Sequence, residues 1–197
     1  MINEHIYRRF NHTVAACFVI YFLFPQYILG INRGYYLFLF WVLILVIEYL
    51  RLNKELNVLG MREYEKKRLA SFVWFASGTC LILGMYEIRA FPQSLAIATI
   101  IMAAYTDPVI GEANKKFGDK GGMIAGLACS FLIFQIILGT LFYSILGSII
   151  AVIAEKPRLK WFDDDLAIQI FPITILTITS LIEGAPHLPQ NVLEESL

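Results

Sequence analysis

Two groups of carboxylates interrupt a chain that is otherwise largely apolar. Asp107 precedes a proline in the middle of the sequence, and Asp163, Asp164 and Asp165 follow one another near its end. A carboxylate is costly to remove from water, so acids beside apolar segments indicate a functional site. Adjacent acids also repel one another unless a cation or basic side chains screen them. We therefore expect at least one acid of the triplet to bind a metal ion or a substrate, and Mg²⁺ fits such ligands well.

A basic, glycine-rich stretch follows Asp107. Glycine lets a backbone approach a phosphate group closely, and the amino end of a helix presents free N–H groups to an anion. Another interpretation is purely structural: Asp107 and Pro108 would begin a short interfacial helix that ends at Gly118. Gly122 and Gly126 also have the spacing typical of closely packed helices. The residues predicted to bind phosphate here are Lys115, Lys116, Gly118, Lys120 and Gly121.

The composition places the chain in the membrane class. Hydrophobic residues make up 58% of the 197 residues and charged residues only 16%, which is far more apolar than a soluble domain. The formal net charge is zero, so nothing favours a nucleic-acid partner. Cys17, Cys80 and Cys129 are widely spaced within apolar segments and predict neither a disulfide nor a zinc site. No P-loop or dinucleotide-binding glycine motif occurs.

The apolar segments predict an all-α integral membrane protein with about seven transmembrane helices. No repeat or low-complexity linker separates them, so residues 1–197 are expected to form one domain. The fourth and sixth are short for a bilayer and must stand nearly upright, thin the bilayer or be covered by neighbours. The expected spans are 13–31, 35–50, 69–86, 92–106, 122–138, 140–154 and 166–182.

The basic residues indicate how these spans are oriented. With seven spans, all but two of the 16 basic residues lie on one side, and the exceptions are Arg33 and Arg89. Because positive loops stay in the cytosol, we expect a cytosolic amino terminus and a carboxyl terminus on the opposite face. Asp107 and the triplet 163–165 then share the cytosolic face. A site built from these acids would be accessible to a nucleotide.

Five short motifs together give the chain a family likeness. They are Glu4 with Arg8, Arg9 and His12; Glu48-x-x-Arg51; Asp107-Pro108 leading to Lys115-Lys116-Phe117-Gly118; Lys120 before Ala125-Gly126; and Asp163-Asp164-Asp165-Leu166. In this pattern the chain resembles the CTP-dependent polyprenol kinase family, which includes dolichol kinase and phytol kinase. That family is similar in its carboxyl half to CDP-lipid synthases.

The resemblance implies transfer of the γ-phosphoryl group of CTP to a lipid alcohol, with Mg²⁺, at the cytosolic membrane face. It implies that Asp107 and Asp164 hold the metal, while Asp163 or Asp165 completes the metal shell or accepts the hydroxyl proton. Lys115, Lys116 and Lys120, with Arg158, would screen the phosphates. The partners implied are the lipid alcohol, the nucleotide and the bilayer. The choice of CTP over ATP comes from the resemblance alone, and the sequence does not indicate the oligomeric state.

Two other functions remain open from the sequence. A cytidylyltransferase that forms a CDP-lipid needs the same acids and basic residues. A non-catalytic lipid transporter or assembly subunit would use the acids as helix caps or in coupling.

Overall fold

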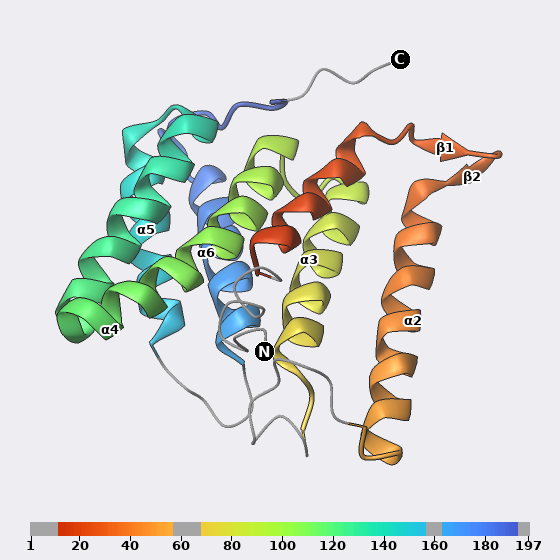
Figure 1. Ribbon diagram of the computed structural model, residues 1–197. Coiled ribbons are helices and arrows are strands. Elements are labelled where there is room, and N and C mark those ends of the chain that lie inside the picture. Colours follow the sequence, from red (N-terminus) through yellow and green to blue (C-terminus); the bar gives the residue numbers. More distant parts are fainter. Residues whose placement is uncertain (1–11, 57–67, 157–162, 193–197) are drawn as a thin grey trace.

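The computed structural model describes residues 12–56, 68–156 and 163–192 and is 78% helical, with six helices. Figure 1 shows helices α3 to α6 gathered together, with α2 standing at one side. The helical class predicted from the sequence is therefore confirmed. Two of the helices, Arg33–Asn53 and Gln93–Leu138, are long and apolar enough to cross a membrane. The count of seven spans and their orientation stay predictions.

The first predicted span is helical only in its first part. A helix runs over His12–Leu23, and its portion Ala16–Leu23 (η1) is a 3-10 helix. It is followed by a two-stranded antiparallel hairpin of Tyr27–Ile28 (β1) and Ile31–Asn32 (β2). The expectation of one helix over 13–31 in an all-α chain is wrong here. Pro25 lacks an N–H donor, and Leu29 and Gly30 take the positive φ angles of a tight hairpin turn.

Helix α2, Arg33–Asn53, begins where this hairpin ends. The side chain of Asn32 caps it by accepting a hydrogen bond from the backbone N–H of Gly34 at 2.7 Å. Most of its apolar side chains are exposed, and its helical partner is α3. Its sequence therefore suits a helix that faces lipid on most sides.

Helices α3, Ser71–Glu87, and α6, Asp164–Ser180, cross through a buried polar contact. The Nε2 of Gln169 donates to the carbonyl of Phe75 at 3.0 Å. The hydroxyl of Thr79 donates to Oε1 of Gln169 at 2.9 Å. Gly78 lies against the same amide, so a Cβ added there would come within 2.9 Å of Gln169 Nε2. Because a buried amide needs its partners, this contact fixes how the two helices are aligned.

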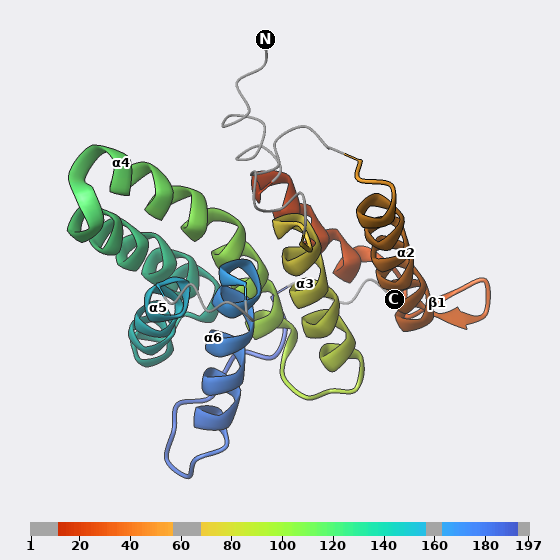
Figure 2. The same ribbon diagram turned by 90° about the horizontal axis from the view of Figure 1, so that it is seen from below.

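The fourth and fifth predicted spans are the two arms of one sharply bent helix, α4, Gln93–Leu138. Figure 2 shows the chain turning back on itself at the bend, which lies at Gly118, whose φ is +71°. The arms pack where Asn114 meets Gly122 and Ile110 meets Gly126. The close packing at Gly122 and Gly126 is as the sequence predicts. Gly118 ends the first arm with a positive φ, but its ψ of −178° is extended and is not that of the expected left-handed helix cap.

Asp107 does not begin a helix, which corrects the structural interpretation of the Asp-Pro pair. The first arm of α4 continues through Asp107, with Pro108 inside it. Proline removes one backbone hydrogen bond to the residue four positions earlier. The arm stays helical because its neighbours on both sides of Pro108 are packed into the protein, including the buried Thr106 and Ile110.

Helix α5, Leu141–Glu155, starts two residues after the end of α4. Gly139 makes the tight connection possible with a φ of +66°. Helix α5 packs against α4 and α6. The segment after α6 returns over the same end of the molecule, where the hydroxyl of Tyr143 donates to the carbonyl of Pro186 at 2.6 Å.

Candidate metal centre

Three side chains from three separate segments meet in a buried cluster. Nδ1 of His12 lies 3.8 Å from Oδ2 of Asp107, and its Nε2 lies 3.9 Å from Oδ1 of Asp165. Each residue offers one ligand atom, and these atoms all lie within 4.8 Å of one another. The cluster therefore brings the isolated aspartate and the triplet together, as the sequence predicts, and adds the histidine between them.

Helix α6 starts in the middle of the aspartate triplet. Asp163 caps the helix, since its Oδ1 accepts a hydrogen bond from the backbone N–H of Asp165 at 3.2 Å. Asp164 and Asp165 occupy the first turn, where the helix dipole favours negative charge. The cap turns Asp165 inward, so that it is only 2% exposed, while Asp164 stays partly exposed.

Two further residues hold the triplet in place. The hydroxyl of Ser71 donates a hydrogen bond to Oδ2 of Asp165. Nη2 of Arg68 donates to Oδ2 of Asp163 at 3.2 Å. Both residues belong to the start of α3 or the turn before it, so the beginning of α3 positions the beginning of α6.

A buried ion pair in α2 holds that turn. The guanidinium of Arg51 forms two hydrogen bonds of 2.7 Å with the carboxylate of Glu48. The same guanidinium donates to the carbonyl of Arg68 at 2.8 Å, and Glu48 accepts the backbone N–H of Ala70 at 2.7 Å. Glu48 and Arg51, which the sequence pattern associates with the site, are thus positioning residues that act through the segment 68–70.

Burial and mutual repulsion make the acids of the triplet difficult to ionise. Burial, and next the charge of Asp164, raises the pKa of Asp163 to about 6. Burial also raises the pKa of Asp165 well above its usual range, and the charge of Asp107 is the second cause. Two acids that are difficult to ionise in each other's presence gain most from a positive ion between them.

The donor set fits a divalent cation. Carboxylate oxygens are the ligands that Mg²⁺ and Mn²⁺ prefer, and an imidazole nitrogen is acceptable to Mn²⁺ and Zn²⁺. The ligand atoms come from His12, Asp107 and Asp165. The structure groups Asp107 with His12 and Asp165, whereas Asp164, the other expected metal ligand, belongs to a second group with Asp163 and Asp165.

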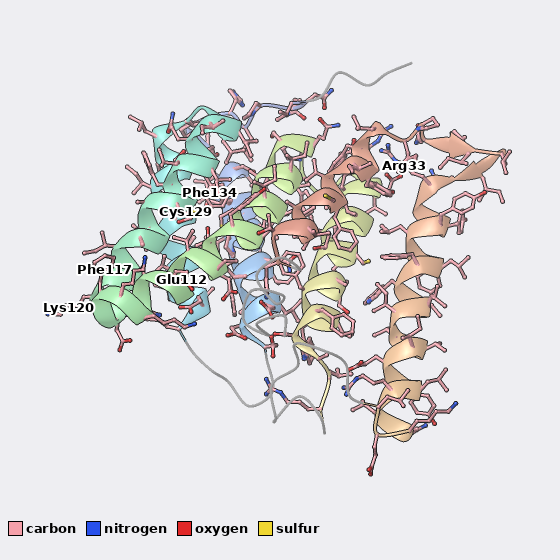
Figure 3. All side chains as sticks on the ribbon, viewed as in Figure 1. Arg33, Glu112, Phe117, Lys120, Cys129 and Phe134 are labelled. Atoms are coloured by element: carbon pink, nitrogen blue, oxygen red, sulfur yellow. The ribbon has the colours of Figure 1, made fainter. Side chains whose placement is uncertain are left out.

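The residues predicted to bind phosphate lie at the far end of the first arm of α4. Lys115, Lys116 and Lys120 are exposed there, and Figure 3 shows Lys120 and Phe117 at the tip of the bend. Lys115 lies eight positions after Asp107, which corresponds to about 12 Å along a helix. Gly118 makes the bend, and Gly121 packs against the side chain of Phe117.

Three predicted residues, Arg8, Arg9 and Arg158, lie outside the described residues. The sequence missed two residues that touch the acids, Arg68 and Ser71. The only signal for them was their position, because they occupy the turn that leads into the third apolar segment, where a cytosolic site would be. Nothing in their local sequence distinguishes them from ordinary loop residues.

Comparisons with protein-family models, with curated proteins and with solved structures find no match for this chain. Membership of the polyprenol kinase family therefore stays a prediction that depends on the motifs.

Proposed function

We propose that this chain is a membrane-embedded phosphotransferase that uses a divalent cation, Mg²⁺, and transfers the γ-phosphoryl group of CTP to a lipid alcohol. One observation carries the proposal: Asp107 and Asp165 come from helices distant in sequence and meet, with His12, in a buried cluster. Phosphoryl transfer depends on positioning and on neutralising charge, and a protein needs little more than such a site to catalyse it. The motifs supply the likeness to lipid kinases.

The metal would be held by Asp107 and Asp165, with His12 as a third ligand or as their charge partner. When bound, the cation supplies the charge that neutralises the phosphate oxygens. Ser71 fixes the orientation of Asp165 through its hydroxyl hydrogen bond. Arg68, which is paired with Asp163, keeps a positive charge beside the triplet.

Asp163 is suited to accept the proton of the lipid hydroxyl. Its pKa of about 6 is close to the working range of a general base near neutral pH. In the proposed step the hydroxyl oxygen forms a bond with the γ-phosphorus, and the bond from that phosphorus to the bridging oxygen breaks. The proton passes to the carboxylate, and the products are a lipid monophosphate and CDP.

The bilayer proposal includes seven crossing segments, a cytosolic site and a far-side carboxyl terminus. It is supported by two helices that are long and apolar enough to cross a membrane. It is also supported by the charge pattern, which leaves only Arg33 and Arg89 on the far side. Single cysteines in a cysteine-free chain test it: Lys120→Cys should react with an impermeant maleimide only from the cytosolic side, and Arg89→Cys only from the other. Labelling of both from one side contradicts the proposed orientation.

Metal binding can be tested without any substrate. Mn²⁺ added to the purified full-length chain should lose its free-ion electron paramagnetic resonance signal as it binds. Asp107→Asn and Asp165→Asn should weaken this binding by roughly tenfold or more. Asp119→Asn, which removes an exposed acid at the bend of α4, is the matched control and should bind as the wild type does. Equal binding by all four proteins contradicts the metal site.

The reaction is tested with a panel of lipid alcohols and radiolabelled nucleotide in detergent. Label transferred from the γ position of CTP identifies a kinase, whereas label from the α position identifies a cytidylyltransferase. ATP in place of CTP tests the choice of base. Transfer should disappear in Asp107→Asn and Asp165→Asn and persist in Asp119→Asn. Absence of transfer from either position with every alcohol contradicts the phosphotransferase proposal.

A further inference from the structure

The two arginines that the charge pattern assigns to the far face line one and the same pocket. Arg33 and Arg89 border a half-open cavity of about 760 Å³ that lies between the end of η1, the start of α2 and the turn from α3 to α4. Figure 3 shows Arg33 at the end of the molecule opposite the start of α6. Helix α3 connects the two ends, since Ser71 contacts the aspartates and Glu87 lines the pocket. The length of α3 from Ser71 to Glu87 separates the carboxylate cluster from the pocket by about 24 Å.

The guanidinium of Arg33 is held in place by two hydrogen bonds. Its Nε donates to Oε1 of Glu87 at 2.8 Å, and its Nη1 donates to the carbonyl of Phe24 at 2.6 Å. The guanidinium lies 4.8 Å from the ring centre of Tyr21 and 5.8 Å from that of Tyr86. Among the described residues its Nη2 makes no hydrogen bond, and this nitrogen keeps contact with solvent at the pocket that Arg33 lines. A guanidinium nitrogen that stays open to a pocket can donate to a ligand that brings an oxygen.

Arg89 adds a second positive charge at the rim. Its backbone has a φ of +60°, an unusual conformation for a residue with a side chain and one that is often kept at ligand sites. The backbone N–H donates to the carbonyl of Tyr86 at 2.8 Å, which holds the turn. With Glu87 the lining has a net charge of +1, and its amides are those of Gln26, Gln93, Gln190 and Asn191. This combination suits an acceptor with a single negative charge, such as a phosphodiester.

An apolar surface continues directly from the polar pocket. A second, shallower hollow shares Tyr27 and Glu87 with it and is bordered by Tyr35, Phe38 and Ile88. These last three side chains are 71%, 61% and 71% exposed. A free phosphate ion has no apolar part that could contact this surface, whereas the acyl chains of a lipid would cover it.

We propose that this pocket binds the phosphodiester headgroup of an anionic phospholipid, whose chains lie over the exposed apolar side chains of α2. Arg33 would donate through Nη2, the guanidinium nitrogen that it does not use on Glu87 or Phe24. Arg89 would supply the net positive charge, since Arg33 is paired with Glu87. The binding site is separate from the carboxylate cluster, so the proposal goes beyond phosphotransfer and does not depend on it.

The test measures thermal unfolding of the full-length chain in a neutral detergent. Soluble dioctanoyl phosphatidylglycerol should raise the unfolding temperature more than dioctanoyl phosphatidylcholine, because only the former has a net negative headgroup. Inorganic phosphate at the same concentration should give no comparable rise. An equal rise with the two lipids overturns the headgroup preference, and an equal rise with inorganic phosphate overturns the assignment to a lipid.

Variants connect the effect to the pocket. Arg89→Gln removes an exposed charge whose side chain has no ion pair among the described residues, so the protein should fold and lose most of the selective rise. Arg33→Lys keeps the charge but lacks the planar guanidinium. It should also lose most of the selective rise in unfolding temperature. Lys54→Gln removes one exposed charge at the other end of α2 and should respond as the wild type does. A wild-type response by Arg89→Gln overturns the proposal. Asp165→Asn should keep the lipid response, which separates this result from any failure of phosphotransfer.

Discussion

The hydroxyl of Ser71 donates a hydrogen bond to Oδ2 of Asp165, although the two residues are 94 positions apart in the sequence. Both are buried. The bond joins the first residue of α3 to the first turn of α6 and leaves Oδ1 of Asp165 directed toward His12. The carboxylate is therefore oriented before any ligand arrives, which is what a metal site requires of the groups around its ligands.

Ser71→Ala should weaken Mn²⁺ binding because Asp165 loses the donor that orients it. We expect a loss of about 10- to 100-fold in affinity, measured by titration of the free-ion resonance signal. Ser148→Ala is the control, since that buried hydroxyl donates to a carbonyl of its own helix, that of Ile145, at 2.9 Å. Unchanged affinity in Ser71→Ala would show that the hydrogen bond has no part in positioning the ligand.

Glu48→Gln should destabilise the protein by about 3–5 kcal/mol because the buried guanidinium of Arg51 loses the carboxylate that accepts two of its hydrogen bonds. The carboxylate is 1% exposed and the guanidinium side chain 4% exposed. Replacing both residues, as Glu48→Gln with Arg51→Met, should recover part of the lost stability, since the buried guanidinium is then removed as well. Chemical unfolding in detergent micelles measures both values.

The control for that pair is Glu55→Gln, an exposed acid just beyond the end of α2. It should change the free energy of unfolding little, as surface charges usually do. If the double variant is less stable than Glu48→Gln alone, the charge of Arg51 is not the cause of the lost stability in Glu48→Gln.

The stability of the metal-free protein should fall as the pH rises from about 4 to about 6. Asp163 has a pKa of about 6 in the folded protein against 3.8 ordinarily, so the folded state binds its proton more tightly than the unfolded state does. The stabilisation is complete below the lower value and is lost as the pH rises through the higher one. Unfolding temperatures in a chelator measure this, and Asp163→Asn, which keeps a capping oxygen, should flatten the slope. A rise in stability over this range would contradict the prediction.

Gly126→Ala should destabilise the bent helix α4, whereas Gly111→Ala should not. A Cβ at Gly126 would lie 2.5 Å from Cγ1 of Ile110, but one at Gly111 would meet nothing within 4 Å. Forcing an extra methyl group into the contact between the arms costs about 1–3 kcal/mol. Thermal unfolding compares the two variants directly, and equal loss in both would mean that the arms do not pack at Gly126.

Much of the helical fold could be predicted from the sequence because apolar runs, and the glycine, proline and charged residues that separate them, are local signals. All seven expected segments are helical in whole or in part, and Gly118 makes the bend that its position favours. The failures are also local in origin. The turn at Leu29 and Gly30 was not recognised inside an apolar run, and Asp107-Pro108 resembles a helix start although the packing of α4 continues the helix through it.

The site was predictable only in part. The acids of the triplet and Asp107 stood out because charge is rare in this chain, and their meeting at one cluster followed from the charge pattern. Which acid of the triplet faces Asp107 did not follow, because a shift of one residue around a helix turns a side chain by about 100°. The structure places Asp165 with Asp107 and His12, and the role of Asp164 as a metal ligand stays a prediction.

The sequence by itself determined the helical class, the rarity of charge and the residues able to hold a cation, since composition and local periodicity carry that information. Only the tertiary structure decided that His12 lies between Asp107 and Asp165, that Ser71 and Arg68 hold the triplet, and that Arg33 and Arg89 share a pocket. Those relationships join residues far apart in the chain. They arise from the way in which the helices pack, and no local pattern encodes that packing.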